Sequence, residues 1–291
     1  MRYAAHEILT APARPSANPL RLLAGVVLGT LVFLSMAFMY AGTVPGLIGV
    51  EAARNFTDGG TPLAVIVMLA EFVFLFAALA LVLRALHRRG LGSLVGPLPR
   101  AVRQFARCTA ALLPLYLITL VLPMPEPYRL EPNLGLSLWL SWLPLGLFCV
   151  FIQIGAEEFV FRGYLQSQLA ARFRHPLVWL GLPSFAFGML HYDTGLAGEN
   201  AWMVALWATL FGLVAADLTA RSGTLGPALA LHFINNIFAI LVTAPLGSLD
   251  GLALYTFPLP LDEEGIAWAV LPVETLFTLC AWLAARLTLR A

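Results

Sequence analysis

The chain has 291 residues, of which 60% are hydrophobic and 11% are charged, whereas soluble domains carry about 25% charged residues. Its formal net charge is +1 and all 17 basic residues are arginine. There is no cationic excess of the kind that binds nucleic acid, and there is no lysine for Schiff-base or P-loop chemistry. The composition therefore excludes a soluble domain and a nucleic-acid partner, and it indicates a polytopic helical membrane protein.

Eight apolar runs have the length and composition of membrane helices, because a helix needs about 20 mostly apolar residues to cross a bilayer. Seven of the runs are clear and one is compound. We predict the helices at 21–43, 62–86, 105–123, 144–172, 176–191, 201–219, 225–245 and 266–288. The predicted fold class is thus all-α, a polytopic transmembrane bundle of about eight helices.

The distribution of arginine predicts the orientation of this bundle. With these spans, all but two of the 17 arginines fall on one side of the membrane, and only Arg54 and Arg129 fall on the other. Arginine accumulates in cytoplasmic loops, so we expect both termini in the cytoplasm. The use of arginine in place of lysine, with abundant Ala, Gly and Pro, favours a high-GC bacterium and hence a multi-pass protein of the bacterial inner membrane.

Charge and proline divide the chain into four predicted parts. They are a cytoplasmic N-terminal tail at 1–20, N-terminal helices at 21–123 with a basic cytoplasmic linker at 86–107, a core at 144–245, and a last helix with its tail at 266–291. We expect the linker to lie along the membrane surface. The stretch 134–143 carries two tryptophans and is expected at the outer interface. The three cysteines lack paired spacing and are expected in the core.

Ionisable side chains within spans are costly and are therefore functional candidates. In the fourth span, Glu158 and Arg162 are four residues apart on one helical face, a spacing that favours an ion pair. Glu157 is rotated by about 100° from Glu158, so the same arginine cannot neutralise both carboxylates in the same way. One carboxylate is expected to be structural and the other free for general-base chemistry. Glu71 and Glu274 belong to no motif.

Two histidines follow on later helices. The chain is expected to turn between Glu157 and His191, and the two residues are equally far from this turn in the sequence. A hairpin of two helices therefore places their side chains at equal depth. Phe187 precedes His191 by four residues and is expected to pack against its ring. His232 and Asn236 are also four apart and offer hydrogen-bond donors suited to an oxyanion. Taken alone, they could equally form hydrogen bonds between helices.

Together these segments resemble the CPBP family of intramembrane proteases, which includes the type II CAAX prenyl endopeptidases and bacterial bacteriocin-processing or self-immunity proteins. The family pattern is EExxxR, FxxxH and HxxxN on three successive core helices. In this chain the pattern stands as Glu157-Glu158-Phe-Val-Phe-Arg162, Phe187-Gly-Met-Leu-His191 and His232-Phe-Ile-Asn-Asn236, with the typical Gly163 after the arginine. The resemblance covers about 147–245 and leaves the outer helices unaligned.

The resemblance implies an endopeptidase with its active site inside the bundle. Glu157 would activate a water molecule, and His191 would help to position it. His232 and Asn236 would stabilise the oxyanion. The supporting residues would be Glu158, Arg162 and Phe187. No cofactor is implied, and zinc or another divalent metal on Glu157, His191 and His232 is the alternative, although the HExxH spacing is absent.

The implied partners are membrane lipid and a protein or peptide substrate with a membrane-associated or C-terminal tail. Two other functions stay open from the residues alone. One is a proton-coupled transporter. Two observations argue against it: the polar residues cluster at one depth, and no inverted repeat is visible. The other is a non-catalytic membrane scaffold or immunity protein, in which an unpaired Glu157 would have no purpose.

Overall fold

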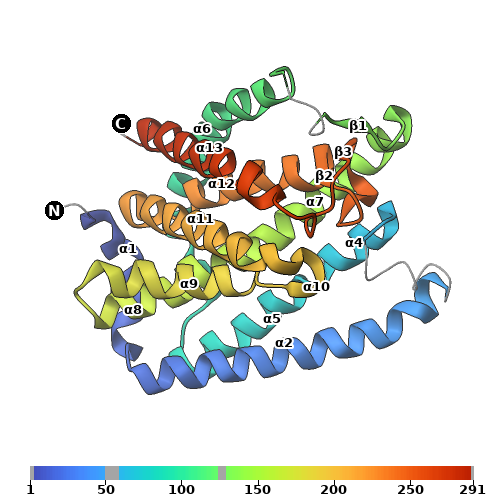
Figure 1. Cartoon of the computed structure of the whole chain (residues 1–291). Helices are drawn as coiled ribbons and strands as arrows, with labels where there is room; N and C mark the ends of the chain where they lie inside the picture. The colour runs from blue at the N-terminus through green and yellow to red at the C-terminus, as the bar shows by residue number, and fades with distance from the viewer. Residues whose placement is uncertain (1–2, 50–58, 124–128, 290–291) are drawn as a thin grey trace.

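The structure is a computed structural model that describes residues 3–49, 59–123 and 129–289. It is a helical bundle in which the three short strands lie at the end opposite to α1 and α8 (Figure 1). The all-α class and the count of about eight helices are confirmed, and each of the eight predicted spans overlaps a helical segment. The predicted span 105–123 is helical but is not among the described segments that are apolar enough to cross a membrane. Arg54, predicted on the outer side, lies outside the described residues.

The helices have the following bounds: α1 Glu7–Thr10, α2 Pro19–Ile48, α4 Pro62–Ala70, α5 Val73–Val82, α6 Leu98–Thr119, α7 Leu136–Glu158, α8 Gln166–Arg172, α9 Leu182–Met189, α10 Thr194–Ala197, α11 Ala201–Ser222, α12 Gly226–Asn236 and α13 Ile266–Thr288. Wider π-helical turns continue α5, α7 and α12, and another leads into α9. They cover Leu83–His87, Phe159–Leu165, Ile237–Val242 and Leu177–Gly181. A small sheet of order β1-β3-β2 joins Glu131–Pro132, Tyr255–Phe257 and Thr243–Pro245.

Within the described ranges, five helical segments are long and apolar enough to cross a membrane. They are Pro19–Gly46, Pro62–His87, Leu136–Arg172, Thr194–Ser222 and Ala267–Thr288, and two shorter apolar helices cover Leu177–Met189 and Gly226–Val242. Large apolar side chains on the outside of the bundle remain exposed, among them Phe38 at 82% and Trp268 at 75%. Contiguous apolar surface of this kind suits lipid contact, so the chain is an integral membrane protein.

Two predicted boundaries differ from the structure. α7 begins at Leu136 and passes through Pro144, so most of the stretch 134–143 is the first part of this helix. α6 begins at Leu98, so the second half of the predicted linker 86–107 is helical. Proline marked a boundary in the sequence, but neighbouring helices make it tolerable inside a membrane helix. Cys280 is exposed, so its predicted place in the core is wrong, while Cys108 and Cys149 are buried as expected.

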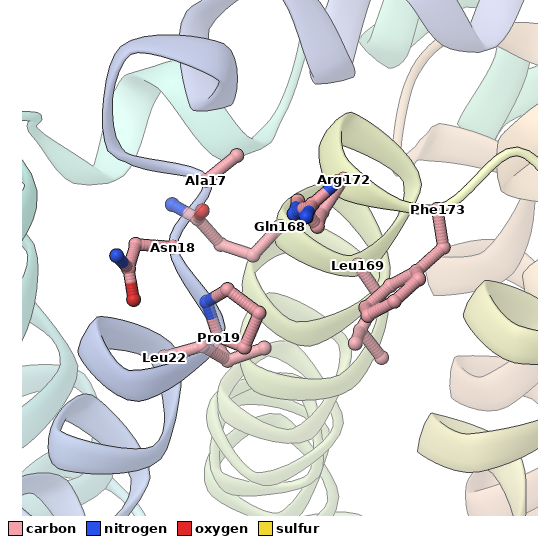
Figure 2. A pocket seen from close by; sticks show the side chains of 8 residues that line it. All are labelled: Ala17, Asn18, Pro19, Leu22, Gln168, Leu169, Arg172 and Phe173. Atoms are coloured by element: carbon pink, nitrogen blue, oxygen red, sulfur yellow. The ribbon is translucent and has the colours of Figure 1, made fainter.

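The N-terminal segment, which we define as residues 3–18, is folded onto the bundle, whereas the sequence predicted a tail. Leu9 and Ala13 are fully buried. The Tyr3 hydroxyl donates a hydrogen bond to Asp217 on α11 over 2.8 Å, and the segment then turns into α2 beside α8 (Figure 2). Helical stretches as short as those in residues 3–18 give only a weak hydrophobic periodicity. Their packing is therefore determined by the surface of the bundle on which they lie.

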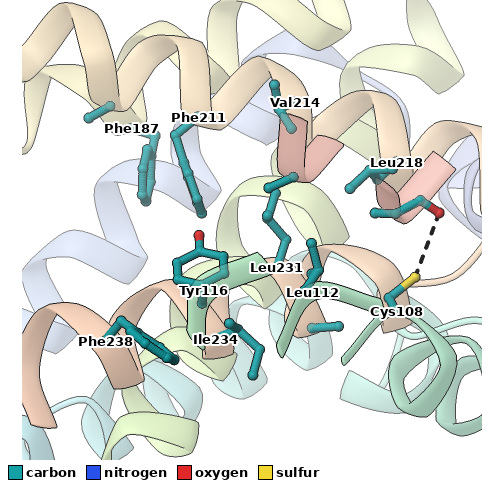
Figure 3. Packing of buried hydrophobic residues seen from close by; sticks show 14 of the residues in the cluster. Cys108, Leu112, Tyr116, Phe187, Phe211, Val214, Leu218, Leu231, Ile234 and Phe238 are labelled. Atoms are coloured by element: carbon teal, nitrogen blue, oxygen red, sulfur yellow. Dashed lines mark hydrogen bonds between the residues drawn. The ribbon is translucent and has the colours of Figure 1, made fainter. Parts of the chain in front are cut away.

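The largest buried cluster lies between α6, α9, α11, α12 and α13, where Leu112, Tyr116, Phe211 and Leu231 meet (Figure 3). Small residues allow close helix contacts in membranes. A Cβ at Gly188 of α9 would overlap Thr209 Oγ1 on α11. α9 therefore lies directly against α11, next to the helix that carries His232.

Candidate active site

Glu158 is the buried centre of an ion-pair cluster. Its side chain is 0% exposed, and Oε1 lies 3.0 Å from Arg162 Nη1 and 2.8 Å from His232 Nδ1. The pair with Arg162 has the four-residue spacing that the sequence predicted, and the bond to His232 joins α7 to α12. Because a carboxylate only accepts hydrogen bonds, Nδ1 of His232 carries a proton in this arrangement with an ionised Glu158.

Glu157 approaches the same imidazole from its other nitrogen. Its Oε2 lies 3.5 Å from His232 Nε2 and has no hydrogen-bond partner among the described residues. The Glu157 side chain is 14% exposed, while that of Glu158 is sealed. Adjacent carboxylates thus face opposite nitrogens of one ring, and only Glu157 retains access to the surroundings.

Aromatic rings hold His232 in place. Its ring centroid lies 5.1 Å from that of Phe211 and 5.9 Å from that of Phe187, both at steep angles. Phe187 also lies 4.6 Å below the guanidinium carbon of Arg162, a distance suited to a cation–π contact. Phe187, which was predicted to be a supporting residue, therefore contacts both Arg162 of the ion-pair cluster and His232.

His191 is positioned through Phe187. Its Nδ1 lies 2.9 Å from the Phe187 carbonyl oxygen, and the two rings are 4.7 Å apart. A carbonyl can only accept, so Nδ1 donates, and Nε2 of the neutral ring is left as an acceptor. No hydrogen bond joins His191 to Glu157 in the part of the chain that the structure describes. The structure connects His191 to the cluster by ring packing.

Asn236 belongs to a chain of hydrogen bonds that the sequence analysis missed. Its Nδ2 donates to Gln153 Oε1 over 2.8 Å, and its Oδ1 accepts from Asn235 Nδ2 over 3.2 Å. Asn235 Oδ1 in turn accepts from the Tyr116 hydroxyl over 3.2 Å. The second amide N–H of Asn236 has no acceptor among the residues that the structure describes. Gln153 had a sequence signal, since it precedes Glu157 by four residues on the same face; Tyr116 on α6 had none.

Three buried polar atoms of the cluster lack hydrogen-bond partners among the described residues: Glu157 Oε2, Glu158 Oε2 and Arg162 Nη2. Buried polar atoms are usually satisfied, so a group of exceptions needs an explanation. These atoms can bind water or the polar groups of a substrate. The cluster therefore combines carboxylate acceptors and a cation in one place within the bundle.

A divalent metal, the alternative to a metal-free site, would need Glu157, His191 and His232 to be arranged as ligands. Across residues 3–49, 59–123 and 129–289 there is no group of three or more His, Cys, Asp or Glu side chains arranged to hold a metal ion. Glu157, His191 and His232, the alternative ligand set, are therefore not assembled as ligands.

This is a membrane-embedded helical protein whose polar cluster unites a free carboxylate, a fixed histidine and a buried ion pair. The model of the Rce1-like family, type II CAAX prenyl endopeptidases, matches residues 139–238, which include Gln153 and every motif residue. The resemblance predicted from the motifs is confirmed, and the family is one of proteases.

A curated relative gives a second comparison. The uncharacterized protein YyaK of Bacillus subtilis is 28% identical over 128 residues, which cover 44% of this chain and 42% of YyaK. The aligned part of the chain thus spans less than half the length of that relative. No solved structure matches the chain significantly.

Proposed function

We propose that the protein is an intramembrane endopeptidase that hydrolyses a peptide bond near a membrane-associated or C-terminal tail of a protein or peptide. The observation that carries the proposal is Glu157, a partly exposed carboxylate whose Oε2 has no hydrogen-bond partner among the described residues and faces His232. An intramembrane carboxylate is costly to keep, and Glu157 Oε2 has the ion-pair distance of 3.5 Å to His232 Nε2 but no hydrogen bond among the described residues. The match to a protease family over residues 139–238 supports this reading.

In the proposed reaction, Glu157 is the general base. It accepts a proton from a water molecule while the water oxygen bonds to the scissile carbonyl carbon. The same proton then passes to the leaving nitrogen as the C–N bond breaks, which restores the carboxylate. His191 Nε2, an acceptor in the neutral ring, would help to orient that water.

His232 would stabilise the oxyanion through Nε2. Nδ1 is bound to Glu158, so the second ring nitrogen, Nε2, would be the donor to the oxyanion. This N–H faces Glu157 in the resting site and is available to the carbonyl oxygen as negative charge develops there. The free amide N–H of Asn236 is proposed as the second donor. Glu158 is proposed as a positioning residue, because it fixes the imidazole through Nδ1.

The test compares the C-termini of membrane and secreted proteins in strains that carry wild-type protein, Glu157→Gln or the control Glu71→Gln at the native locus. Glu71 is a second intramembrane glutamate outside the cluster, in the break between α4 and α5. Loss of a general base lowers turnover by about 100-fold to 10,000-fold, so uncut tails should accumulate only with Glu157→Gln. Unchanged C-termini at normal protein levels would reject the protease and favour the scaffold or immunity function.

We also propose that the protein lies in the bacterial inner membrane with both termini in the cytoplasm. The positive-inside distribution of arginine supports this. α1, near the start of the chain, and the end of α13 lie at the same end of the bundle (Figure 1). Fusions of a fluorescent protein to either end should fluoresce, since such proteins mature in the cytoplasm; alkaline phosphatase fusions that are active at either end would contradict the orientation.

A further inference from the structure

An open groove lies where the N-terminal segment meets the ends of two membrane helices, away from the proposed active site. Its polar half has a volume of about 400 Å³. The residues that line this half are Arg14, Pro15, Ser16, Ala17, Asn18, Pro19, Arg21 and Arg172. The apolar half is a shallow recess of about 10 Å³ that adjoins it and is lined by Leu22, Leu169 and Phe173 (Figure 2). We call the two halves together the arginine groove.

The walls of the arginine groove are fixed by hydrogen bonds. Ser16 Oγ, buried on the N-terminal segment, lies 2.9 Å from His87 Nδ1. Asn18 Oδ1 accepts from the backbone N–H groups of Leu20 and Arg21, over 2.9 and 3.3 Å, and so caps α2. The groove is therefore preformed, and a ligand need not order it.

Two of the three arginines in the groove carry unneutralised charge. Arg14 forms an ion pair with Glu7. Arg21 and Arg172 are exposed, and neither has a carboxylate within ion-pair distance in the described part of the chain. The groove thus presents two guanidinium groups without a carboxylate partner among the described residues, and that of Arg172 lies 5.8 Å from the centroid of the Phe173 ring. Such groups match a phosphate in charge and geometry.

The groove is also placed at the surface of the bilayer. One membrane span begins at Pro19 and another ends at Arg172. Leu22 and Leu169 each lie one turn further into these spans, so the apolar half lies on the side of the groove toward the interior of the spans. A ligand that fills both halves needs an anionic head and an apolar chain, and an anionic phospholipid has both.

We propose that the arginine groove binds an anionic phospholipid, with its phosphate between Arg21 and Arg172 and an acyl chain along Leu22, Leu169 and Phe173. Basic pockets between membrane helices at the cytoplasmic surface bind such head groups. A zwitterionic lipid is disfavoured because its ammonium group would meet the same arginines. The site would anchor the junction between the N-terminal segment, α2 and α8.

The test uses the full-length protein, delipidated in detergent, with equal amounts of phosphatidylglycerol and phosphatidylcholine added before native mass spectrometry. Wild-type protein should retain phosphatidylglycerol in preference to phosphatidylcholine. Arg21→Gln with Arg172→Gln should reduce that occupancy by roughly tenfold to thirtyfold. The matched control, Arg103→Gln with Arg107→Gln on α6, removes the same charge from exposed positions outside the groove and should retain the lipid.

Three results would overturn the proposal. They are equal retention of the two lipids, an equal loss in the control variant, which would show general charge attraction, and displacement of phosphatidylglycerol by millimolar inorganic phosphate, which would show a site for a free anion. Thermal unfolding of each variant checks that the fold persists. The readout is bound lipid, so it is independent of whether the protein cleaves peptides.

Discussion

Loss of one partner of the buried ion pair should lower the stability of the fold by a measurable amount. Arg162 and Glu158 are 1% and 0% exposed and lie 3.0 Å apart. Arg162→Met keeps most of the side-chain volume but leaves the Glu158 carboxylate buried without its cation. Removing one partner of such a pair costs about 3–5 kcal/mol, and the lost contact with the Phe187 ring adds about 1 kcal/mol. We expect the free energy of unfolding to fall by about 4–6 kcal/mol.

The assay is reversible unfolding in mixed micelles titrated with a denaturing detergent. Glu158→Gln with Arg162→Met removes both charges and should recover most of the lost stability, because neither charge is then left alone. Arg221→Met is the matched control: its pair with Asp217 has the same spacing but is partly exposed, so we expect a loss of about 1 kcal/mol. Wild-type stability in Arg162→Met, or no recovery in the double variant, would refute the reasoning.

Three further predictions follow from packing, burial and hydrogen bonding. Gly188→Val should destabilise the bundle by about 1–3 kcal/mol in the same assay, because its side chain would overlap Thr209; an unchanged midpoint would contradict the close contact of α9 and α11. Burial lowers the pKa of His6 from 6.5 to about 4, so the N-terminal segment should lose up to about 3 kcal/mol of docking stability as the pH falls from 6.5 to 4 and none above that window. Hydrogen exchange of residues 3–18 should reveal this, and His6→Phe should abolish the pH dependence. Gln153→Leu leaves an N–H of Asn236 without its acceptor and should cost about 1–3 kcal/mol; cleavage and stability equal to wild type would show that the amide needs no support.

Relationships within a single helix were the part of the site that the sequence could predict. The four-residue spacing of Glu158 and Arg162 predicts contact because a helix returns to the same face after that interval. The same rule places Phe187 against His191, and both contacts are present in the structure. Apolar length alone predicts a membrane span, and five of the eight predicted spans, at 21–43, 62–86, 144–172, 201–219 and 266–288, coincide with described helices that are long and apolar enough to cross a membrane.

Contacts between helices were much harder to predict. The 2.8 Å bond from Glu158 to His232 and the chain from Tyr116 to Asn235 depend on which helices are neighbours, and periodicity within one helix does not determine that. The N-terminal segment shows the same limit, since nothing in its composition predicts the surface that buries Leu9. The arginine groove arises only from this docking, because its two walls are far apart in the sequence.

The geometry of one imidazole explains how two consecutive glutamates come to differ. Neighbouring helical positions diverge by about 100°, so Glu157 and Glu158 cannot contact the same atom in the same way. An imidazole has nitrogens on two sides, and His232 receives Glu158 at Nδ1 and faces Glu157 at Nε2. Arg162 can neutralise only the carboxylate on its own face of the helix, which is Glu158. The Glu158 carboxylate, held by this arginine, fixes the orientation of the His232 ring. Glu157 therefore keeps its lone pairs free beside a ring that cannot rotate away, which is the arrangement that the proposed general base requires.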